Sequence, residues 1–312
     1  MANEVKSTES GCPDFQSIVL VGGMGTRLEE KRKIIDIEKF PEMSPSFAGE
    51  IGPKGLALLQ PEWSENSKPL TDWHLKIHRN SSKVSQISLA LGCRADLMMD
   101  YYRKSELMML EEKNPAGTLA PLIKLYSQNK LTDGIYVYAN GDNLADIDLE
   151  KCYKDGYAAA VRSGVDTAAF VIDVAALVPW EESDAYGTLD MDFETGKVNS
   201  FKEKGPVETN TFTEINGSRK TPINSGFSII VNPLKLFNDF LDKEVVDTSL
   251  KLEEGLLPYK GNESIVKYET FYEKLASLNR MVAVLHKGYW TDLGTEEKIV
   301  LCEQYLPENF FS

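Results

Sequence analysis

Short apolar runs alternate with amphipathic stretches along the first half of the chain. The run IVLV at residues 18–21 is too short for a helix and rich in β-branched residues, which predicts a buried strand. The same patterns predict further strands at residues 56–59, 84–91 and 135–138, and helices at residues 70–79 and 95–103. Strands that alternate with helices in this way predict a parallel sheet with crossover helices.

The second half of the chain is richer in strands. Strands are predicted at residues 167–174, 188–192, 198–202, 227–231 and 281–285, and helices at residues 234–241, 271–278 and 296–305. Few helices separate the first four of these strands, which is typical of a mixed sheet. The predicted fold class is therefore α/β, with a Rossmann-like, mixed but mostly parallel sheet flanked by helices.

Composition narrows the classes of function. The 312 residues can bury a large core, while a net charge of −14 and a pI near 4.8 argue against a nucleic-acid partner. The four cysteines are scattered, as in proteins with reduced thiols, and no apolar run reaches 18 residues. Residues 1–15 lack the apolar stretch of a signal peptide and suggest a disordered lead-in. We therefore expect a cytoplasmic protein without a membrane partner.

The stretch IVLVGGMGTRLEE places three glycines and an arginine directly after the first strand. Gly22, Gly23 and Gly25 allow backbone N–H groups to approach an anion, and residues 26–33 can begin a helix whose N-terminus attracts phosphate. The spacing fails the dinucleotide pattern G-x-G-x-x-G, whose last position is Leu28, and no Walker loop occurs. What remains is a phosphate-binding loop that ends in Arg27, whose planar guanidinium can grip phosphate oxygens.

Three further stretches carry charged residues beside predicted strands. Lys54 in GPKGLALL precedes a short apolar strand, and Asp142 follows the strand at residues 135–138. Asp292 in GYWTDLGT follows the strand at residues 281–285. Carboxylates at the carboxyl ends of strands in α/β sheets commonly hold ligands and metal ions.

In this order the stretches resemble the sugar-1-phosphate nucleotidyltransferase family. The matching motifs are GGMGTRL at 22–28, PK at 53–54, GD at 141–142, YGTLDMD at 186–192, EK at 203–204, NSG at 224–226 and WTDLGT at 290–295. Within the family, the chain looks most like the glucose-1-phosphate cytidylyltransferase and heptose-1-phosphate guanylyltransferase branches. The resemblance implies Mg²⁺-dependent transfer of a nucleotidyl group from a nucleoside triphosphate to a sugar 1-phosphate, with release of pyrophosphate.

The resemblance also implies one catalytic domain over residues 16–312. Its nucleotide-binding part spans about 16–150, a sugar-binding β subregion spans about 151–295, and a C-terminal helix occupies 296–312. The base, the sugar and the oligomeric state stay open, a homo-oligomer among the alternatives. By the same resemblance the nucleotide-binding residues are Gly22, Gly23, Gly25, Thr26, Gly117, Thr118 and Gly141, and the sugar-binding residues are Gly187, Glu203, Lys204, Asn224 and Gly226.

The chemistry of the reaction assigns roles to the charged residues. A phosphate monoester loses its second proton near pH 6, so a sugar 1-phosphate is already an anionic nucleophile at neutral pH. Catalysis then requires positioning and neutralisation of charge. We expect Arg27 and Lys54 to be catalytic contacts to phosphate oxygens, and Asp142 and Asp292 to bind Mg²⁺.

Two other functions compete with this interpretation. Asp146-Ile147-Asp148 forms the D-x-D string of glycosyltransferases that consume nucleotide sugars, although Asp148 also suits the N-cap of a helix. A non-catalytic regulatory subunit that binds nucleotide sugars is the other alternative. His74 and His78 lie four residues apart but lack the glutamate of the metalloprotease pattern, so we expect them to be structural.

The segment at residues 29–52 is much longer than the linker that relatives place between the first two motifs. It carries Lys/Arg and Glu clusters together with Pro41 and Pro45. Loops of this length are usually functional or disordered. We expect the segment to be mobile without ligand and to cover the triphosphate as a lid.

Overall fold

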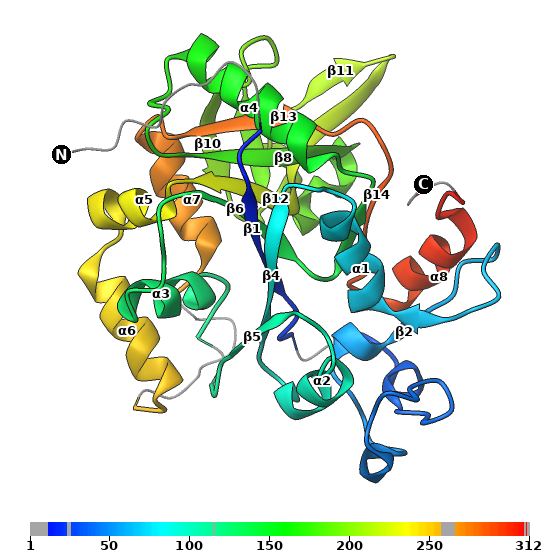
Figure 1. Ribbon diagram of the computed structural model, residues 1–312. Helices are drawn as coiled ribbons and strands as arrows, with labels where there is room; N and C mark the ends of the chain where they lie inside the picture. Colours follow the sequence, from blue (N-terminus) through cyan, green and yellow to red (C-terminus); the bar gives the residue numbers. More distant parts are fainter. Residues whose placement is uncertain (1–11, 24–25, 115, 257–265, 309, 311–312) are drawn as a thin grey trace.

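The computed structural model describes residues 12–23, 26–114, 116–256, 266–308 and 310. Its centre is a ten-stranded mixed sheet whose main path runs β10–β9–β12–β6–β1–β4–β5 (Figure 1). Three more strands join beside this path, since β11 pairs with β12, and β8 pairs with both β12 and β13. Within the described residues, no helix is both long and apolar enough to cross a bilayer.

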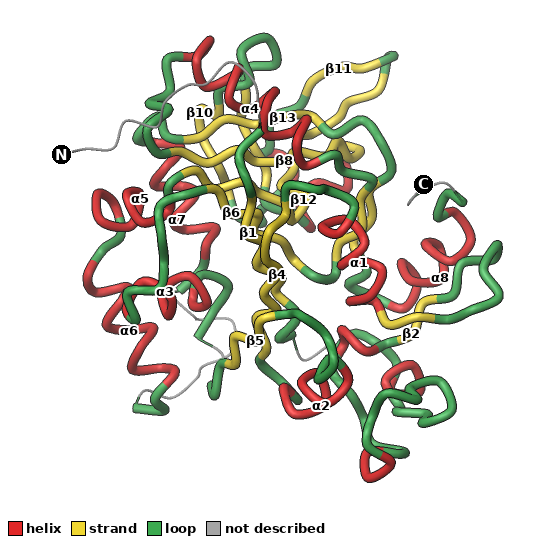
Figure 2. Tube along the Cα trace, viewed as in Figure 1, coloured by secondary structure: helices red, strands yellow, loops and turns green. Residues whose placement is uncertain are grey.

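Figure 2 shows the helices and strands along the chain. The strands of the large sheet are β1 (Phe15–Leu20), β4 (Val84–Leu91), β5 (Met108–Glu111), β6 (Ile135–Asn140), β8 (Phe170–Pro179), β9 (Thr188–Met191), β10 (Val198–Lys202), β11 (Thr213–Ile215), β12 (Ser218–Val231) and β13 (Met281–Leu285). Two small sheets pair β2 (Leu58–Leu59) with β3 (Lys68–Pro69), and β7 (Asn143–Ala145) with β14 (Trp290–Asp292). The helices are α1 (Leu70–Arg79), α2 (Ala95–Tyr101), α3 (Ala120–Ser127), α4 (Leu149–Ser163), α5 (Pro233–Phe240), α6 (Lys243–Glu253), α7 (Tyr268–Ser277) and α8 (Glu296–Tyr305).

The pairing directions change across the sheet. Strand β1 is parallel to both β4 and β6, and β4 is parallel to β5. On the other side of β6, strand β12 runs antiparallel to β6 and β8, and β13 lies parallel to β8. The predicted α/β class, a Rossmann-like mixed sheet with a parallel centre and flanking helices, is confirmed.

Helices cover both faces of the sheet because its central strands are apolar on both sides. Along β6, Ile135, Val137 and Ala139 pack with α1, α4 and α8, while Tyr136 and Tyr138 pack with α3, α5, α6 and α7. A strand buried on both faces has a nearly continuous apolar sequence, as IYVYA does here. The parallel strands therefore end together at one protected edge.

Most predicted elements are confirmed, and several have the predicted bounds, including α1, α8, β4, β10 and β13. The helix expected at residues 26–33 is wrong, since a turn is followed by the 3₁₀ helix Glu30–Lys33. The strand expected at residues 56–59 is reduced to β2, because Lys54–Leu56 forms a 3₁₀ turn. The sequence patterns missed the strands β3, β5, β7, β11 and β14 and the helices α3 and α6.

The segment at residues 29–52 is packed onto the protein and is not an open lid. Ile35, Phe40 and Met43 are buried at 1 %, 1 % and 3 % exposure in a cluster with residues of α1, α2 and β4. Arg32 pairs with Glu296 and Glu303 of α8, and Arg94 pairs with Glu50. These contacts contradict the expectation of a segment that closes over the ligand, because moving it would expose buried apolar side chains.

The chain joins the fold earlier than the expected lead-in of residues 1–15 implies. Phe15 begins β1 and is completely buried, and Cys12 is buried as well. Cys12 and Phe15 are therefore part of the core. Residues 1–11 lie outside the described residues.

Candidate active site

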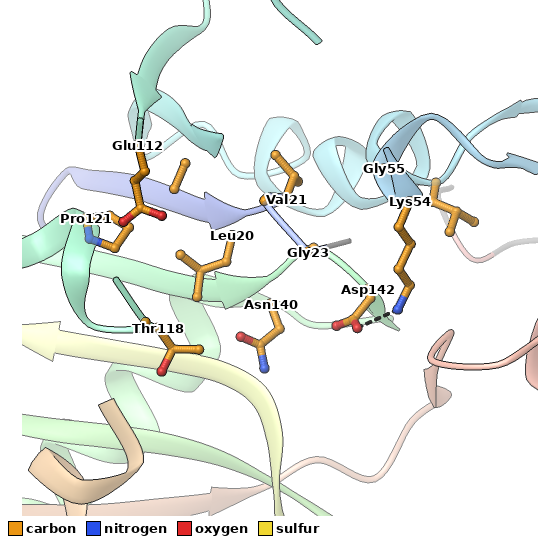
Figure 3. Close-up of a pocket in the computed structure, with 15 residues that line it drawn as sticks. Leu20, Val21, Gly23, Lys54, Gly55, Glu112, Thr118, Pro121, Asn140 and Asp142 are labelled. Carbon is orange, nitrogen blue, oxygen red and sulfur yellow. Dashed lines mark hydrogen bonds and ion pairs between the residues drawn. The ribbon is translucent and has the colours of Figure 1, made fainter. Parts of the chain in front are cut away.

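A cavity of about 330 Å³ lies where β1, β4 and β6 end (Figure 3). Its lining residues include many of those predicted from the motifs, namely Gly22, Gly23, Lys54, Gly117, Thr118, Gly141 and Asp142. The carboxyl edge of the parallel strands is where α/β proteins commonly bind ligands. Gly25 lies outside the described residues, and Thr26 is exposed in the turn that follows.

The first glycine of the loop is required by close backbone contact. A Cβ atom at Gly22 would lie 2.6 Å from the backbone N of Gly92, which follows β4. The loops after β1 and β4 therefore approach each other closely only because residue 22 has no side chain. Gly22 and Gly23 then line the cavity.

Lys54 and Asp142 form an ion pair at one end of the cavity (Figure 3). The Lys54 Nζ lies 2.6 Å from Asp142 Oδ2, and the lysine side chain is 11 % exposed. Lys54 comes from the 3₁₀ turn Lys54–Leu56, and Asp142 follows β6. A cation and a carboxylate from separate segments thus meet at the same end of the cavity.

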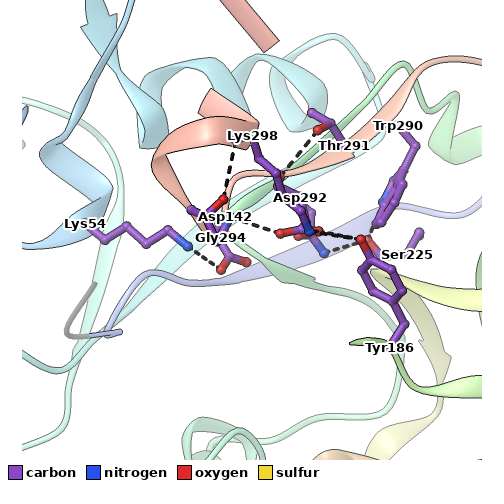
Figure 4. Close-up of polar contacts among 11 residues, drawn as sticks. Lys54, Asp142, Tyr186, Ser225, Trp290, Thr291, Asp292, Gly294 and Lys298 are labelled. Atoms are coloured by element: carbon purple, nitrogen blue, oxygen red, sulfur yellow. Dashed lines mark hydrogen bonds and ion pairs between the residues drawn. The ribbon is translucent and has the colours of Figure 1, made fainter. Parts of the chain in front are cut away.

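Asp292 is brought beside Asp142 by the small sheet of β7 and β14. These strands are antiparallel, with Asp292 opposite Asn143, and the Leu293 N–H donates to the Asp142 carbonyl at 2.7 Å. Figure 4 shows both carboxylates in the same region, although 150 positions separate them in the sequence. The expected convergence of the two strand ends is therefore present.

The carboxylate of Asp292 is held by Tyr186 of the YGTLDMD motif and by Lys298, which lies in no motif. Asp292 Oδ2 accepts hydrogen bonds from Lys298 Nζ and from the Tyr186 hydroxyl at 2.9 Å. Burial alone would raise the pKa of Asp292, but hydrogen bonds from Lys298, Gly294 and Tyr186 outweigh burial and hold it below its usual value. Lys298 lies in the first turn of α8 in the run TEEK, which carries no signal beyond a charged helix start.

Arg27 lies next to this carboxylate. A Cβ atom built on Gly294 would lie 3.4 Å from Arg27 Nη2 and 2.8 Å from Asp292 Oδ1. Arg27 is exposed, so its guanidinium is accessible to a phosphate. Arg27 of the glycine loop therefore lies close to Asp292 and Gly294 of the WTDLGT motif.

Three of the predicted sugar-binding residues adjoin each other. The Asn224 N–H donates to the Gly187 carbonyl at 2.9 Å, and the Gly226 N–H donates to Asn224 Oδ1 at 2.8 Å. Gly226 has a φ of +84°, and a Cβ there would lie 1.8 Å from Asn143 Nδ2. Because Asn143 belongs to β7, this group lies against the strand that follows Asp142 and pairs with Asp292 of β14.

Glu203 and Lys204 lie just beyond β10. The Glu203 N–H donates to Glu273 Oε1 of α7 at 3.4 Å, and Lys204 is exposed. Their roles at the sugar stay predictions.

A fully buried carboxyl lies beneath the sugar-side residues. Asp173 of β8 accepts a hydrogen bond from the Asn224 side-chain amide, whose Oδ1 also accepts from the Tyr268 hydroxyl at 3.3 Å. Within the described residues, Asp173 Oδ1 has no hydrogen-bond partner. Burial raises the pKa of Asp173 to about 8 despite the hydrogen bond from Asn224. No motif marked this residue.

His74 and His78 are structural, as expected. Both are fully buried, with His74 Nδ1 2.8 Å from the Asn143 carbonyl oxygen and His78 Nδ1 3.0 Å from Ser17 Oγ. Their Nε2 atoms lie 3.1 Å apart. Burial lowers the pKa of His74 to about 4 and that of His78 well below its usual value, so the pair links α1 to β1 and β7 as neutral rings.

The D-x-D string lies in a different pocket from the one that the glycine loop lines. Asp146 Oδ1 is 2.8 Å from His286 Nε2, and Asp148 Oδ1 caps α4 by accepting from the Lys151 N–H at 2.9 Å. Both aspartates line a second pocket that shares no lining residue with the cavity at β1. The capping interpretation of Asp148 is confirmed.

Comparison with known proteins decides the family. The model of the nucleotidyl transferase family matches residues 95–308, more than half of the chain. The chain belongs to the nucleotidyl transferase family. Members of this family generally use a divalent metal ion. The match includes the GD, EK, NSG and WTDLGT motifs and α8.

Individual members of the nucleotidyl transferase family are only distantly similar in sequence. A probable mannose-1-phosphate guanylyltransferase 1 of Oryza sativa subsp. japonica is 22% identical over 291 residues, which cover 90% of this chain and 61% of the relative. Mannose-1-phosphate guanylyltransferase 1 of Arabidopsis thaliana is 22% identical over 290 residues with the same coverage. The chain thus spans about 61% of the length of these relatives.

Solved structures support the fold. A crystal structure of HddC from Yersinia pseudotuberculosis complexed with GMP-PN has a TM-score of 0.51 and 20% identity, and covers 92% of this chain and 96% of that chain. A second HddC structure from the same organism has a TM-score of 0.51 and 21% identity, with coverage of 94% and 99%. The shared architecture extends along nearly the whole of both chains.

Proposed function

We propose that the protein transfers a guanylyl group from GTP to a sugar 1-phosphate, giving a GDP-sugar and pyrophosphate. The observation that carries the proposal is the convergence of the glycine loop, Lys54 and Asp142 around one cavity, with Asp292 on the adjoining strand. The choice of guanine follows the curated relatives, which are named as guanylyltransferases.

The residues around the cavity suit a reaction between two anions. The sugar 1-phosphate attacks the α-phosphorus of GTP through a phosphate oxygen, and the bond to the β-phosphate oxygen breaks as pyrophosphate leaves. The positively charged side chains of Arg27 and Lys54 contact the phosphate oxygens and neutralise their charge. The backbone N–H groups of Gly22 and Gly23, which line the cavity, can also approach the phosphates. Gly187, Asn224 and Gly226 orient the sugar from the side of β12.

The two aspartates fit the requirements of a Mg²⁺ ion. Each already holds a lysine ammonium, so the site attracts cations, and carboxylate oxygens are ligands that Mg²⁺ accepts. Among the described residues, no group of three or more His, Cys, Asp and Glu side chains could hold a metal ion. Asp142 and Asp292 would therefore hold Mg²⁺ together with substrate phosphates and water. When bound, the ion would neutralise charge on the triphosphate.

Pyrophosphate release tests the proposed function. The full chain is incubated with GTP, Mg²⁺ and a panel of sugar 1-phosphates, and we expect pyrophosphate only when a sugar 1-phosphate is present. Formation of a GDP-sugar in equal amount identifies the second product. Absence of both products with every sugar tested contradicts the proposal. Consumption of a supplied GDP-sugar with transfer to an acceptor would instead favour the glycosyltransferase alternative.

A further inference from the structure

The chain after Arg27 forms a short stretch, RLEEKR at residues 27–32, that is anchored on α8. Leu28 is buried at 5 % exposure in one cluster with Leu293, which follows β14, and with Ile299 of α8. The side chain of Arg27 itself stays exposed. Arg27 is therefore followed directly by a residue that packs near the start of α8.

Arg32 gives this stretch a second anchor. Its Nε donates to Glu296 Oε1, and its Nη1 and Nη2 donate to Glu303 Oε1 and Oε2 at 3.0 and 3.2 Å. We call Arg32, Glu296 and Glu303 the α8 clamp; all three side chains are only 19–20 % exposed. Because the guanidinium binds carboxylates through a planar fork, the clamp fixes the orientation of the stretch as well as its distance from α8, which an exposed ion pair does not.

The same turn of α8 holds the carboxylate of Asp292. Glu296 is the first residue of the helix, and Lys298 in that turn donates to Asp292 Oδ2. Arg27 reaches the same place, since a Cβ atom built on Gly294 would lie 3.4 Å from Arg27 Nη2. Among the described residues that line the cavity, none belongs to the α8 clamp. The clamp therefore joins two parts of the site from outside the cavity.

The α8 clamp depends on the charge of its arginine. Glu296 Oε2 is buried and, within the described part of the chain, accepts no hydrogen bond. Removal of Arg32 would leave two largely buried carboxylates without their guanidinium, and a buried charge that loses its partner destabilises its surroundings. Loss of Arg32 should therefore shift the stretch at residues 27–32 relative to the first turn of α8.

We propose that Arg32 is a positioning residue, whose ion pairs with α8 hold Arg27 beside Asp292, where it can contact phosphate. This inference rests on the proposed function, in which Arg27 neutralises charge on the triphosphate. Such stabilisation depends on preorganised geometry, and a displacement of about 1 Å can lower the rate about 100-fold. Arg32 thus acts on catalysis through Arg27 and not through contact with the substrates.

A double-mutant cycle tests whether Arg32 acts through Arg27. Turnover is measured by pyrophosphate release with GTP and one sugar 1-phosphate. We expect Arg32→Met to lower kcat/KM by about 10- to 100-fold in the wild-type background, but by less than about 2-fold in the Arg27→Ala background, because coupled residues are not additive. The same fold loss in both backgrounds would overturn the inference, since it would show a structural role that is independent of Arg27.

Arg32→Lys extends the test to a milder change. Lysine keeps the positive charge but lacks the planar fork, so this variant should lose most of the activity that Arg32→Met loses. If Arg32→Met does not fold, the cycle with Arg27→Ala is run with Arg32→Lys instead. Wild-type kcat/KM in Arg32→Lys would contradict the inference, because the orientation imposed by the fork would then be irrelevant.

Arg280→Met is the matched control. The side chain of Arg280 is 20 % exposed and pairs with Asp166, so its burial and charge resemble those of Arg32. Arg280 precedes β13, which runs in the same direction as β6, and therefore lies at the opposite edge of the sheet from the cavity. This variant should keep kcat/KM within about 2-fold of the wild type even if its thermal unfolding midpoint falls. A loss as large as that of Arg32→Met would refute a specific role for Arg32.

Crystal structures of the wild-type protein and of Arg32→Lys separate this inference from the proposed function. Absence of turnover with every triphosphate and sugar would contradict the proposed function, but it would leave the geometric claim testable. Displacement of the Arg27 guanidinium from Gly294 and Asp292 in the variant supports positioning by Arg32. An Arg27 side chain that keeps its wild-type place in Arg32→Lys refutes it.

Discussion

Two pairs of carboxyl groups in the same site have opposite surroundings. Asp142 and Asp292, in the GD and WTDLGT motifs at the paired strands β7 and β14, each pair with a lysine. Glu112, at the end of the cavity away from Lys54, and Asp173, which pairs with Asn224, each have a buried oxygen that accepts no hydrogen bond from the described residues. The pKa of Asp292 is lowered, whereas the pKa values of Glu112 and Asp173 are both raised to about 8. The charge of each carboxyl group is therefore set by its burial and by whether a cation pairs with it, and not by residue type alone.

The largest expected effect comes from removing a paired carboxylate. Asp142→Asn or Asp292→Asn should each lower kcat by about 10²- to 10³-fold, because a charge that stabilises the transition state is lost. Pyrophosphate release at several Mg²⁺ concentrations measures this. The control is Asp148→Asn, which removes a carboxylate of the D-x-D string but keeps an N-cap that Asn fills equally well. Full activity in either site variant, or in excess chelator, would show that the aspartates do not bind the ion.

Arg27→Ala should lower kcat/KM by about 100-fold while leaving the fold intact. The side chain is exposed, so its contribution is to phosphate binding rather than to packing. Turnover and the thermal unfolding midpoint are measured together. Arg162→Ala, at an exposed position on α4, is the matched control and should change neither. An unchanged kcat/KM would remove Arg27 from the mechanism.

Lys298→Met should move the acidic limb of the pH–rate profile to higher pH. Lys298 hydrogen-bonds to Asp292 and keeps its pKa low, so the ionised form persists as the pH falls. Without the ammonium, Asp292 takes up its proton at a higher pH and activity is lost there. Lys298→Arg keeps the charge and should retain most of the acidic limb. Coincident profiles for wild type and Lys298→Met would refute this coupling.

Asp173→Asn should have the smallest effect, a change in how stability depends on pH. The folded protein binds a proton at Asp173 up to about pH 8, whereas an unfolded aspartate with a pKa of 3.8 has lost it. Between these values the folded state holds more protons, so this residue makes stability fall as the pH rises. In chemical unfolding experiments from pH 5 to 8, the free energy of unfolding of the variant should decrease less steeply with pH than that of the wild type. A slope that matches the wild type would show that Asp173 is ionised in the fold.

The sequence predicted the two lysine-paired aspartates, Asp142 and Asp292, but not the buried carboxyl groups of Glu112 and Asp173. Asp142 and Asp292 each follow an apolar strand within a recognisable motif, so strand pattern and motif together located them. Glu112 and Asp173 stand in no motif, and their significance comes from burial and from the partners that they lack. Both properties depend on tertiary packing, which a local pattern does not encode.

The errors in local structure have the same origin. The EEKRK stretch after Arg27 was expected to continue a helix, but Arg32 is drawn to Glu296 and Glu303 of α8, and only a 3₁₀ turn forms. Leu56 was expected in a strand, but the Lys54–Leu56 turn directs Lys54 towards Asp142. In both places a long-range ion pair accompanies a conformation that local preference does not predict.

The ion pairs of Arg32 have a consequence for the order in which the site matures during synthesis. They join positions 264 and 271 residues apart, and β14 likewise reaches β7 from the far end of the sequence. A ribosome makes the glycine loop first, yet the partners that surround Arg27 and Asp142 emerge only with β14 and α8. Closing so long a loop is slow relative to local folding. A nascent chain should therefore complete this site in one late step rather than by degrees.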